Sequence, residues 1–288
     1  MAMNLKAHWR TMRQASWLGW QLEANWTSPW LFLAYSIMKP IAGTLILVVM
    51  YLVVLQGVGN NIALFSFMYV GNAFYVFVAQ VMLGATSVIL EDREHYHTLK
   101  QIYIAPISLY AYIIGRTLSK AVIAAIACVI TMAFGMVALG VPVQLLQVDY
   151  LLLAVAMVIG LACIFMIGIA LAGVTFLVAK HSTGINEGIA GMLYLFSGVV
   201  YPLSVLPSWG QAVGHLLPTT YWLELVRRAL LPNLDISAVS GLGGVSTLEI
   251  MAALTVTTIA FFALSAAVFR YADRRARSKG KVDMITSY

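Results

Sequence analysis

The feature that most constrains this chain is a run of 28 residues, Ala63 to Leu90, that contains no charged side chain. About 20 consecutive apolar residues are enough for a helix to cross the ~30 Å hydrocarbon core of a membrane. A soluble domain has about 25% charged residues, whereas this chain has 10%, together with 61% hydrophobic residues. Because it has so few charges to present to water, we expect the chain to be embedded in lipid.

Five further apolar runs are also long enough to cross a membrane. We therefore predict an all-α polytopic membrane protein with six transmembrane helices, which form a single transmembrane domain over residues 1–288. The spans are expected at residues 31–55, 63–90, 110–139, 150–178, 182–201 and 248–269.

Lysine and arginine residues are distributed unevenly among the connections. They occur before the first predicted span, after the second, fourth and sixth, but not at 56–62 or 140–149. Since positive charges mark cytoplasmic loops, we expect both termini in the cytoplasm and a multi-pass protein of a prokaryotic cytoplasmic (inner) membrane. Arg227 and Arg228 are an exception, and Glu224 lies one turn before Arg228, where the two can pair. Topology accounts for the basic tail, so nucleic-acid binding is not expected.

The first thirty residues contain five of the seven tryptophans. Trp9 and Met12 fall on one helical face, and Arg10 and Arg13 fall on a neighbouring one. This pattern is typical of a helix that lies in the membrane interface, with basic residues toward lipid phosphate. We predict such an in-plane helix at residues 4–28, with membrane lipid as its partner, and expect Pro29 to end it.

The stretch EDREHYHTLKQIYIAPIS, residues 91–108, separates the second and third spans. Thr98 and Gln101 match a helix capping box, and Pro106 stops a helix, so we predict a short helix at 98–105. Leu99, Ile102 and Tyr103 share one face of it. Because a two-turn helix is unstable alone, this face must dock, either on the ends of its own spans or on a soluble protein.

Polar residues inside the predicted spans are costly and need partners. In the second span Tyr69, Asn72 and Gln80 fall roughly on one face. They either form hydrogen bonds between helices or line a polar path.

Four charged residues lie near predicted span ends. Lys39 either snorkels to the interface or contacts an anionic head group. Arg116 and Lys120, one turn apart, meet lipid phosphate or the carboxylates at 91–94. Glu187 lies near the start of the fifth span, where the helix dipole favours a carboxylate.

The segment between the fifth and sixth spans is apolar but interrupted by prolines. We predict two short outer re-entrant helices within residues 203–231, at 208–216 and 219–231. Backbone of this kind is tolerated in a membrane only where protein or a cavity shields it. The residues that would form an outer gate there are Pro202, Pro207, Trp209 and Pro218.

Motifs for catalysis are not found in the sequence. It contains no GxxxxGK[ST] phosphate loop and no HExxH or clustered Cys/His metal pattern. Ser197 has no base within its span, and Cys128 and Cys163 are interpreted as apolar packing residues. We expect this chain to have no catalytic, metal or cofactor site of its own.

Two motifs, each at a defined topological position, carry a family resemblance. The first is T-L-x-x-hydrophobic-x-x-P-I-S, from Thr98 to Ser108. The second is S-G-x-x-x-P-x-x-x-L-P-x-W followed by P-x-T-Y, from Ser197 to Tyr221. With the in-plane helix and six spans, the chain resembles the membrane (permease) subunit of type-2 ATP-binding-cassette exporters.

The resemblance implies a half-transporter. Two copies would form a homodimer, and each would bind a cytoplasmic ATPase subunit that holds ATP and Mg²⁺. The helix at 98–105 would be the coupling helix that contacts this ATPase. In the family a glycine commonly precedes the Thr-Leu pair and an acidic residue follows it, whereas this chain has His97 and Lys100. The coupling residues would be Glu91, Arg93, Glu94, Thr98, Leu99, Lys100, Gln101, Ile102 and Tyr103.

The resemblance also places the second and fifth spans along the dimer interface and the path, which would be lined by Tyr69, Asn72, Gln80 and Ser197. The function implied is ATP-driven export of a hydrophobic or amphipathic substrate such as a drug, a lipid or a lipid-linked glycan. One alternative is a lipid extruder or mechanical transmitter without a solute tunnel. Another is an ATP-independent channel or carrier, which the shortage of broken helices and buried acids disfavours.

Overall fold

The computed structural model describes residues 5–24, 28–55, 62–178, 182–234 and 236–278, and every regular element in these ranges is a helix. Those before the third predicted span are α1 (Leu5–Ala24), α2 (Pro29–Leu55), α3 (Ile62–Phe77), η1 (Val78–Met82), α4 (Leu83–Leu90), η2 (Glu91–His95) and α5 (Leu99–Ile104). The others are α6 (Leu109–Ala138), α7 (Tyr150–Leu177), α8 (Ser182–Phe196), η3 (Leu203–Val205), α9 (Ser208–Leu216), α10 (Pro218–Leu230), α11 (Ile236–Ser240) and α12 (Thr247–Ser278).

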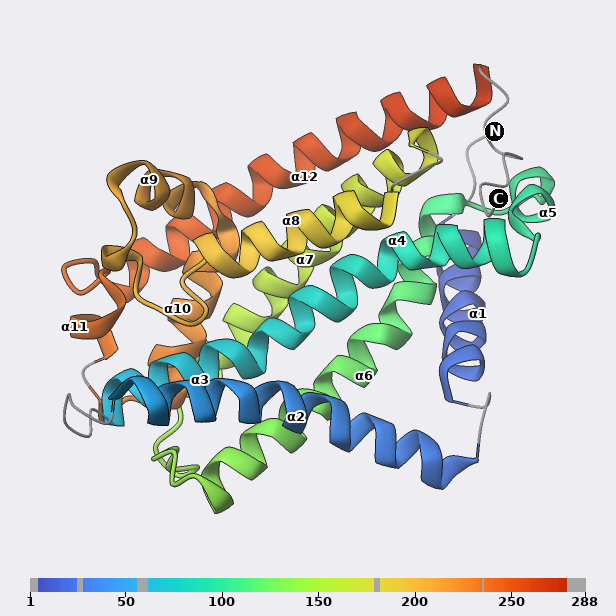
Figure 1. Cartoon of the computed structure of the whole chain (residues 1–288). Helices are drawn as coiled ribbons and strands as arrows, with labels where there is room; N and C mark the ends of the chain where they lie inside the picture. The colour runs from blue at the N-terminus through green and yellow to red at the C-terminus, as the bar shows by residue number, and fades with distance from the viewer. Residues whose placement is uncertain (1–4, 25–27, 56–61, 179–181, 235, 279–288) are drawn as a thin grey trace.

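The long helices run alongside one another through the molecule (Figure 1). At one end α1 crosses them and α5 caps the turn after η2, and we call this the α5 end. At the other end α9, α10 and α11 are grouped, and we call this the α10 end. The helix predicted at 4–28 is α1, with residues 4 and 25–27 outside the described part of the chain. α2 begins at Pro29, two residues before the predicted start of the first span at residue 31.

Within the described residues, four helices are long and apolar enough to cross a membrane, namely Ile62–His95, Leu109–Ala138, Tyr150–Leu177 and Thr247–Ala276. They agree with the predicted all-α membrane fold and with four of the predicted spans. In the first of these, α3, η1, α4 and η2 form one continuous helix of 34 residues, which we call the second-span helix.

The predicted count of six spans is not confirmed. α2 has 27 residues, but the apolar stretch found within it is only Pro40–Val53. α8 has 15 residues, about 22 Å at 1.5 Å per residue, which is shorter than a ~30 Å hydrocarbon core. The span predicted to continue to residue 201 ends early because Gly198 has a φ of 65°, a left-handed conformation that terminates helices and suits glycine.

The predicted outer helices form as α9 and α10, but their environments differ. α9 leaves Trp209 exposed, whereas eleven of the 13 residues of α10 are buried. Trp222 of α10 packs so closely on α7 that a Cβ on Gly160 would lie 2.0 Å from its ring. Its ring also meets Phe74 and Phe77 edge-on. α10 is therefore part of the main core and does not lie over the bundle as a separate cover.

Candidate coupling site and charged cluster

The second-span helix changes its hydrogen-bonding pattern at the α5 end. Residues Glu91–His95 form a π-helical turn, and the amide of Tyr96 donates to the carbonyl of Glu91 at 2.9 Å. Such turns are often found at functional sites. Within this turn the side chains of Asp92 and Arg93 are both buried, so the charges that interrupt the apolar sequence point largely into the protein.

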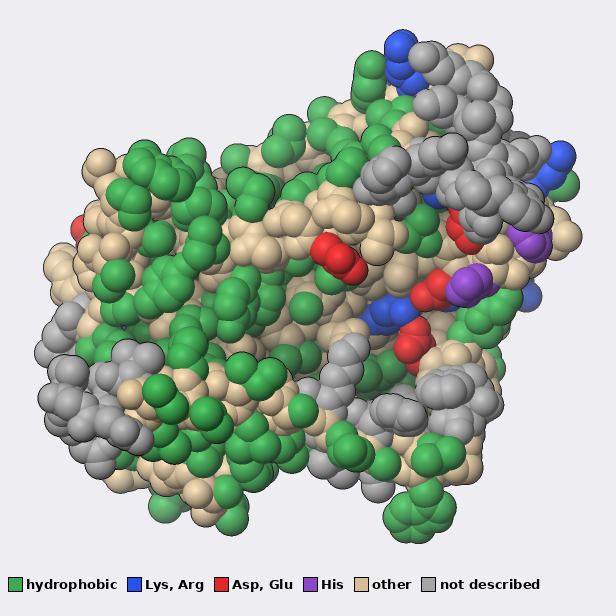
Figure 2. Space-filling model, in the orientation of Figure 1, with side chains coloured by type: hydrophobic (Ala, Val, Ile, Leu, Met, Phe, Trp, Pro, Cys, Tyr) green, Lys and Arg blue, Asp and Glu red, His purple; other side chains and the backbone are tan. Residues whose placement is uncertain are grey.

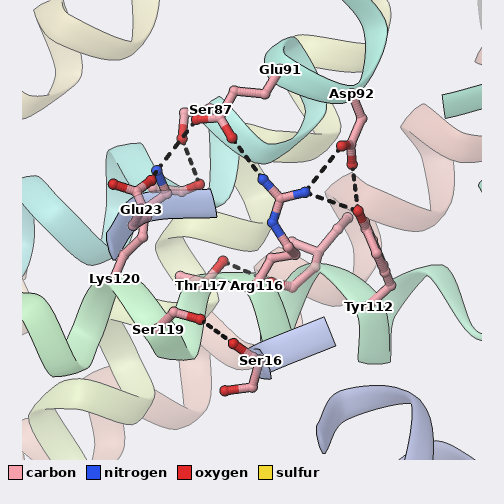
Figure 3. Close-up of polar contacts among 12 residues, drawn as sticks. Ser16, Glu23, Ser87, Glu91, Asp92, Tyr112, Arg116, Thr117, Ser119 and Lys120 are labelled. Atoms are coloured by element: carbon pink, nitrogen blue, oxygen red, sulfur yellow. Dashed lines mark hydrogen bonds and ion pairs between the residues drawn. The ribbon is translucent and has the colours of Figure 1, made fainter. Parts of the chain in front are cut away.

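Arg116 of α6 forms the centre of a buried charged cluster (Figure 3). Its Nη1 lies 3.0 Å from Asp92 Oδ1, and its Nη2 lies 2.7 Å from Glu91 Oε2. The hydroxyl of Tyr112, one turn before Arg116, donates to Asp92 Oδ2 at 2.9 Å. The Arg116 side chain is only 2% exposed, so these contacts offset the cost of holding its charge away from water.

Lys120 extends the cluster to α1. Its Nζ pairs with Glu23 of α1 and lies 3.3 Å from Glu91 Oε1. The sequence left two partners open for Arg116 and Lys120, lipid phosphate or the carboxylates at 91–94, and the structure selects the carboxylates. We use the name charged cluster for Glu23, Glu91, Asp92, Tyr112, Arg116 and Lys120.

Arg93 and Glu94 form a second, smaller contact. Arg93 Nε lies 2.9 Å from Glu94 Oε1, and its Nη1 donates to the carbonyl of Thr175 on α7 at 3.3 Å. Arg93 is 3% exposed, so its side chain links η2 to α7 inside the protein, and its part in coupling stays a prediction.

α5 forms where a short helix was predicted, with Thr98 as its N-cap and Ala105 as its C-cap, immediately before Pro106. The predicted capping box is wrong, because the Thr98 side chain makes no capping hydrogen bond. A capping side chain needs an extended backbone, whereas Thr98 has helical angles, with φ −96° and ψ −11°. The backbone amide of Thr98 donates to the carbonyl of Asp92 at 2.8 Å and so joins the start of α5 to η2.

The predicted apolar face of α5 is turned into the protein. Leu99 is 3% exposed and belongs to a core cluster at the α5 end, with Ile102 and Tyr103 packed against it. The Tyr103 hydroxyl donates to Asp273 of α12, and its ring meets Phe176 of α7 edge-on. This face therefore docks on the ends of its own helices, which decides between the two alternatives that the sequence left open.

The opposite side of α5 is exposed. Ile104 is 80% exposed. We define the outer face of α5 as the exposed residues His95, Tyr96, His97, Lys100, Gln101 and Ile104. Figure 2 shows acidic, basic and histidine side chains gathered toward the α5 end of the molecule. On the side of the molecule that is drawn, hydrophobic side chains cover much of the half toward the α10 end.

His97 adopts a backbone conformation that glycine accepts more easily. Its φ is 52°, in the left-handed region that is uncommon for residues with a Cβ. This is the position at which the resemblance led us to expect glycine. The departure in sequence therefore leaves the turn before α5 in a conformation suited to the expected residue.

The four predicted path residues are all at least half-buried. Tyr69 is fully buried and its hydroxyl donates to the carbonyl of Thr131 at 2.6 Å. Ser197 is also buried and shares a hydrogen bond of 2.5 Å with Thr219. Asn72 is half-buried and accepts a hydrogen bond from the Tyr194 hydroxyl of α8 at 3.2 Å, and Gln80 is half-buried. Tyr69, Ser197 and Asn72 thus have hydrogen-bond partners inside this chain. The path role stays a prediction for all four residues.

Two further charged residues were singled out in the sequence, Glu187 and Lys39. Glu187 is exposed on α8, and the placement of the Lys39 side chain is outside what the structure describes.

Gly184, Gly188 and Gly191 lie on one side of α8, and nothing lies within 4 Å of where a Cβ would be at each. α8 therefore presents a face of small residues that nothing in the described chain covers.

At the α10 end, Arg227 is fully enclosed, a feature that the sequence did not predict. Its Nη2 donates to the carbonyls of Gly198 at 2.7 Å and Val199 at 3.1 Å, just after α8. Its Nε donates to the carbonyl of Phe67 at 3.1 Å. A Cβ on Gly71 would lie 2.1 Å from Nη2. Burial lowers the pKa of Arg227 to about 10, so the guanidinium remains charged at neutral pH.

The predicted pair of Glu224 and Arg228 is confirmed, with 2.9 Å between Oε1 and Nε. Arg228 also donates to the carbonyls of Leu242 and Val245 at 3.1 and 3.0 Å. Among the predicted gate residues, Pro218 is buried within α10, Pro202 is half-buried, and Pro207 and Trp209 are exposed. Their role as a gate stays a prediction.

The sequence profile of the ABC-2 type transporter family matches residues 10–231, from α1 to the end of α10. The chain belongs to this family. It is a multi-pass membrane protein and an ABC transporter permease component, and the ATPase activity of such transporters lies in a separate subunit. No curated protein matches the chain.

Several residues of the ABC-2 domain were missed by sequence reasoning. Tyr112 was detectable, because it lies four residues before Arg116 and so on the same helical face. Glu23 carried no such signal, because its partner Lys120 is 97 residues away in sequence. Arg227 carried none either, because its partners are backbone carbonyls. Within the described residues no group of three His, Cys, Asp or Glu side chains suited to a metal ion is found.

Proposed function

We propose that this chain is the permease subunit of an ATP-driven exporter that moves a hydrophobic or amphipathic substrate, such as a drug, a lipid or a lipid-linked glycan. Two copies pair, and each binds a cytoplasmic ATPase subunit that holds ATP and Mg²⁺. In this proposal the α5 end faces the cytoplasm of a prokaryotic cell, and the α10 end faces outward.

The observation that carries the proposal is the two-sided packing of α5. Leu99 and Tyr103 fix its inner side to α7 and α12, whereas its outer face, including Ile104, is exposed. A force applied to the outer face is therefore transmitted directly to two long helices. The ATPase is thus proposed to contact Lys100, Gln101 and Ile104, and Leu99 supports α5 from within.

A substitution on each side of α5 tests this assignment. Ile104→Asp is expected to weaken binding of the ATPase subunit by about thirtyfold or more, the effect of losing an interface hot spot of ~2 kcal/mol. The fold is expected to survive, since Ile104 makes little contact with the rest of the chain. Leu99→Asp is expected to unfold the α5 end, because it places a charge in the core.

Co-purification of the ATPase subunit and ATP hydrolysis by the complex provide the measurements, with thermal unfolding of the permease as the check on folding. Leu146→Asp is the matched control, because Leu146 is fully exposed in the connection beyond the far end of α6. If Ile104→Asp and Leu146→Asp retain the same ATPase binding and turnover, the proposed docking face is incorrect.

The exposed glycine side of α8 supports pairing with a second copy. Small residues four apart, as in Gly184 and Gly188, allow two membrane helices to approach closely. A cysteine introduced at Met192, which is exposed on α8, is expected to cross-link two copies, since the native Cys128 and Cys163 are buried. A cysteine at Val129, exposed on α6, is the control. Equal cross-linking at both positions would argue against pairing through α8.

The substrate class is to be tested by stimulation of ATP hydrolysis in the reconstituted complex across drugs, lipids and lipid-linked glycans. Stimulation by lipids alone would favour the lipid extruder. Failure of every hydrophobic or amphipathic compound would contradict the substrate class proposed here.

A further inference from the structure

α1 is seated on α6 through small residues. Ala15 and Gly19 of α1 face Gly115 and Ser119 of α6, so that two pairs spaced four residues apart meet. A Cβ on Gly115 would lie 2.3 Å from the carbonyl oxygen of Met12, and the Ser119 hydroxyl donates to the carbonyl of Ser16 at 2.7 Å. The stripe of α1 that would otherwise rest on lipid is therefore occupied by protein.

Beside this contact, an open groove of about 580 Å³ lies between α1 and α6. On α1 its lining repeats every three or four residues, as expected for one side of a helix. The residues that matter for recognition are Trp9, Arg13, Trp17 and Trp20 on α1, with Leu118 and Val122 on α6.

The side chains that line the groove suit a lipid at the membrane surface. Leu118 and Val122 are exposed on a helix that crosses the membrane, so lipid chains are the solvent beside them. Trp9 and Trp17 are 64% and 62% exposed, and tryptophan favours the depth of the lipid head groups. Arg13 is an exposed cation at the same place, and its planar guanidinium suits a phosphate.

We propose that the groove between α1 and α6 binds an anionic glycerophospholipid, with its phosphate on Arg13 and its upper acyl chain between the tryptophans and the Leu118–Val122 surface. Occupancy of this site holds α1 in its seat. Because Glu23 of α1 pairs with Lys120 and so joins the charged cluster, the lipid also supports the helices that carry α5.

A second contact connects α1 to the coupling region. On the other flank of α1, Arg10, Ala15 and Leu18 line a groove with Pro106 and Ile107, which follow the C-cap residue of α5. In this proposal α1 therefore lies between the membrane surface and Pro106–Ile107, the segment that follows α5. Resting on the function proposed above, we expect ATP hydrolysis by the complex to depend on anionic lipid.

The binding step is tested on the permease alone, without any ATPase. Native mass spectrometry of the purified chain, titrated with phosphatidylglycerol, is expected to show one retained lipid that Arg13→Gln weakens about fivefold, the effect of one cation near an anionic surface. Arg13→Lys is expected to retain most of the binding. Trp17→Ala, which opens the groove without changing charge, is expected to weaken phosphatidylglycerol and phosphatidylcholine alike.

Arg274→Gln is the matched control, because Arg274 is exposed near the end of α12 and the same charge is removed. Equal weakening by Arg13→Gln and Arg274→Gln would overturn the site, as would equal retention of phosphatidylcholine and phosphatidylglycerol by the unaltered chain. Displacement of the lipid by millimolar inorganic phosphate would show that the site selects free phosphate and would also overturn the proposal.

The dependence on lipid is then tested with the complex in nanodiscs with and without phosphatidylglycerol. The unaltered complex is expected to lose at least half of its ATP hydrolysis without this lipid, and the Arg13→Gln complex is expected to be low in both. Equal hydrolysis in the two lipid mixtures would overturn the coupling part. If the chain stimulates no ATPase at all, the proposed function fails, while the binding experiment still decides the lipid site.

Discussion

Replacing Arg116 with methionine tests whether the charged cluster holds the α5 end together. Methionine fills a similar volume but removes the charge, which leaves the buried Asp92 with the Tyr112 hydroxyl as its remaining side-chain partner. At an effective dielectric constant of ~20, charges ~3 Å apart attract by roughly 5 kcal/mol. Breaking a buried ion pair by removing one partner typically costs about 3–5 kcal/mol, and we expect Arg116→Met to lower the free energy of unfolding by this amount.

A double-mutant cycle separates this coupling from the packing of the side chains. Asp92→Asn is expected to cost less than Arg116→Met, because Arg116 keeps Glu91, whose side chain is 26% exposed. The loss in free energy of unfolding of the double variant is expected to be about 2 kcal/mol smaller than the sum of the two single losses, since no buried Asp92–Arg116 charge is left without a partner.

The measurement is equilibrium unfolding in mixed micelles of mild detergent and sodium dodecyl sulfate, followed by circular dichroism. Arg274→Met, which removes an exposed arginine, should change the free energy of unfolding by less than about 0.5 kcal/mol. Losses for Arg116→Met and Asp92→Asn that add within ~0.5 kcal/mol would refute the reasoning, because independent sites behave in that way.

Two further predictions concern the backbone. His97→Val is expected to lower the free energy of unfolding by about 1–2 kcal/mol, because a β-branched residue is strained at a φ of 52°, whereas His97→Gly should be close to neutral; equal effects in thermal unfolding would contradict this account. Gly71→Ala is expected to cost about 2–3 kcal/mol, because its Cβ would clash with the Arg227 guanidinium that three carbonyls hold in place. Gly43→Ala, with nothing within 4 Å, should be neutral or slightly stabilising, and an equal loss at both glycines would rule out the clash.

The sequence by itself determined the class of the protein and the position of its short helix. Runs of apolar residues such as Ala63–Leu90 dictate membrane helices, because a hydrogen-bonded helix is the structure that hides the backbone from lipid. Pro106 fixed the end of α5, and the i, i+3, i+4 spacing identified the face of Leu99 and Tyr103. These signals are local, so they are visible without knowledge of the fold.

Only the tertiary structure decided which side of each element has a partner. It turned Leu99 inward and left Ile104 outward, placed Tyr69 against Thr131, buried α10, and joined Glu23 of α1 to Lys120 of α6. It also showed that α8 ends at Phe196 and that the Thr98 side chain makes no capping hydrogen bond. In a chain this apolar every helix face is equally suited to lipid or to protein, so the hydrophobic pattern cannot distinguish them. Close contacts of small residues and paired charges far apart in sequence make that choice.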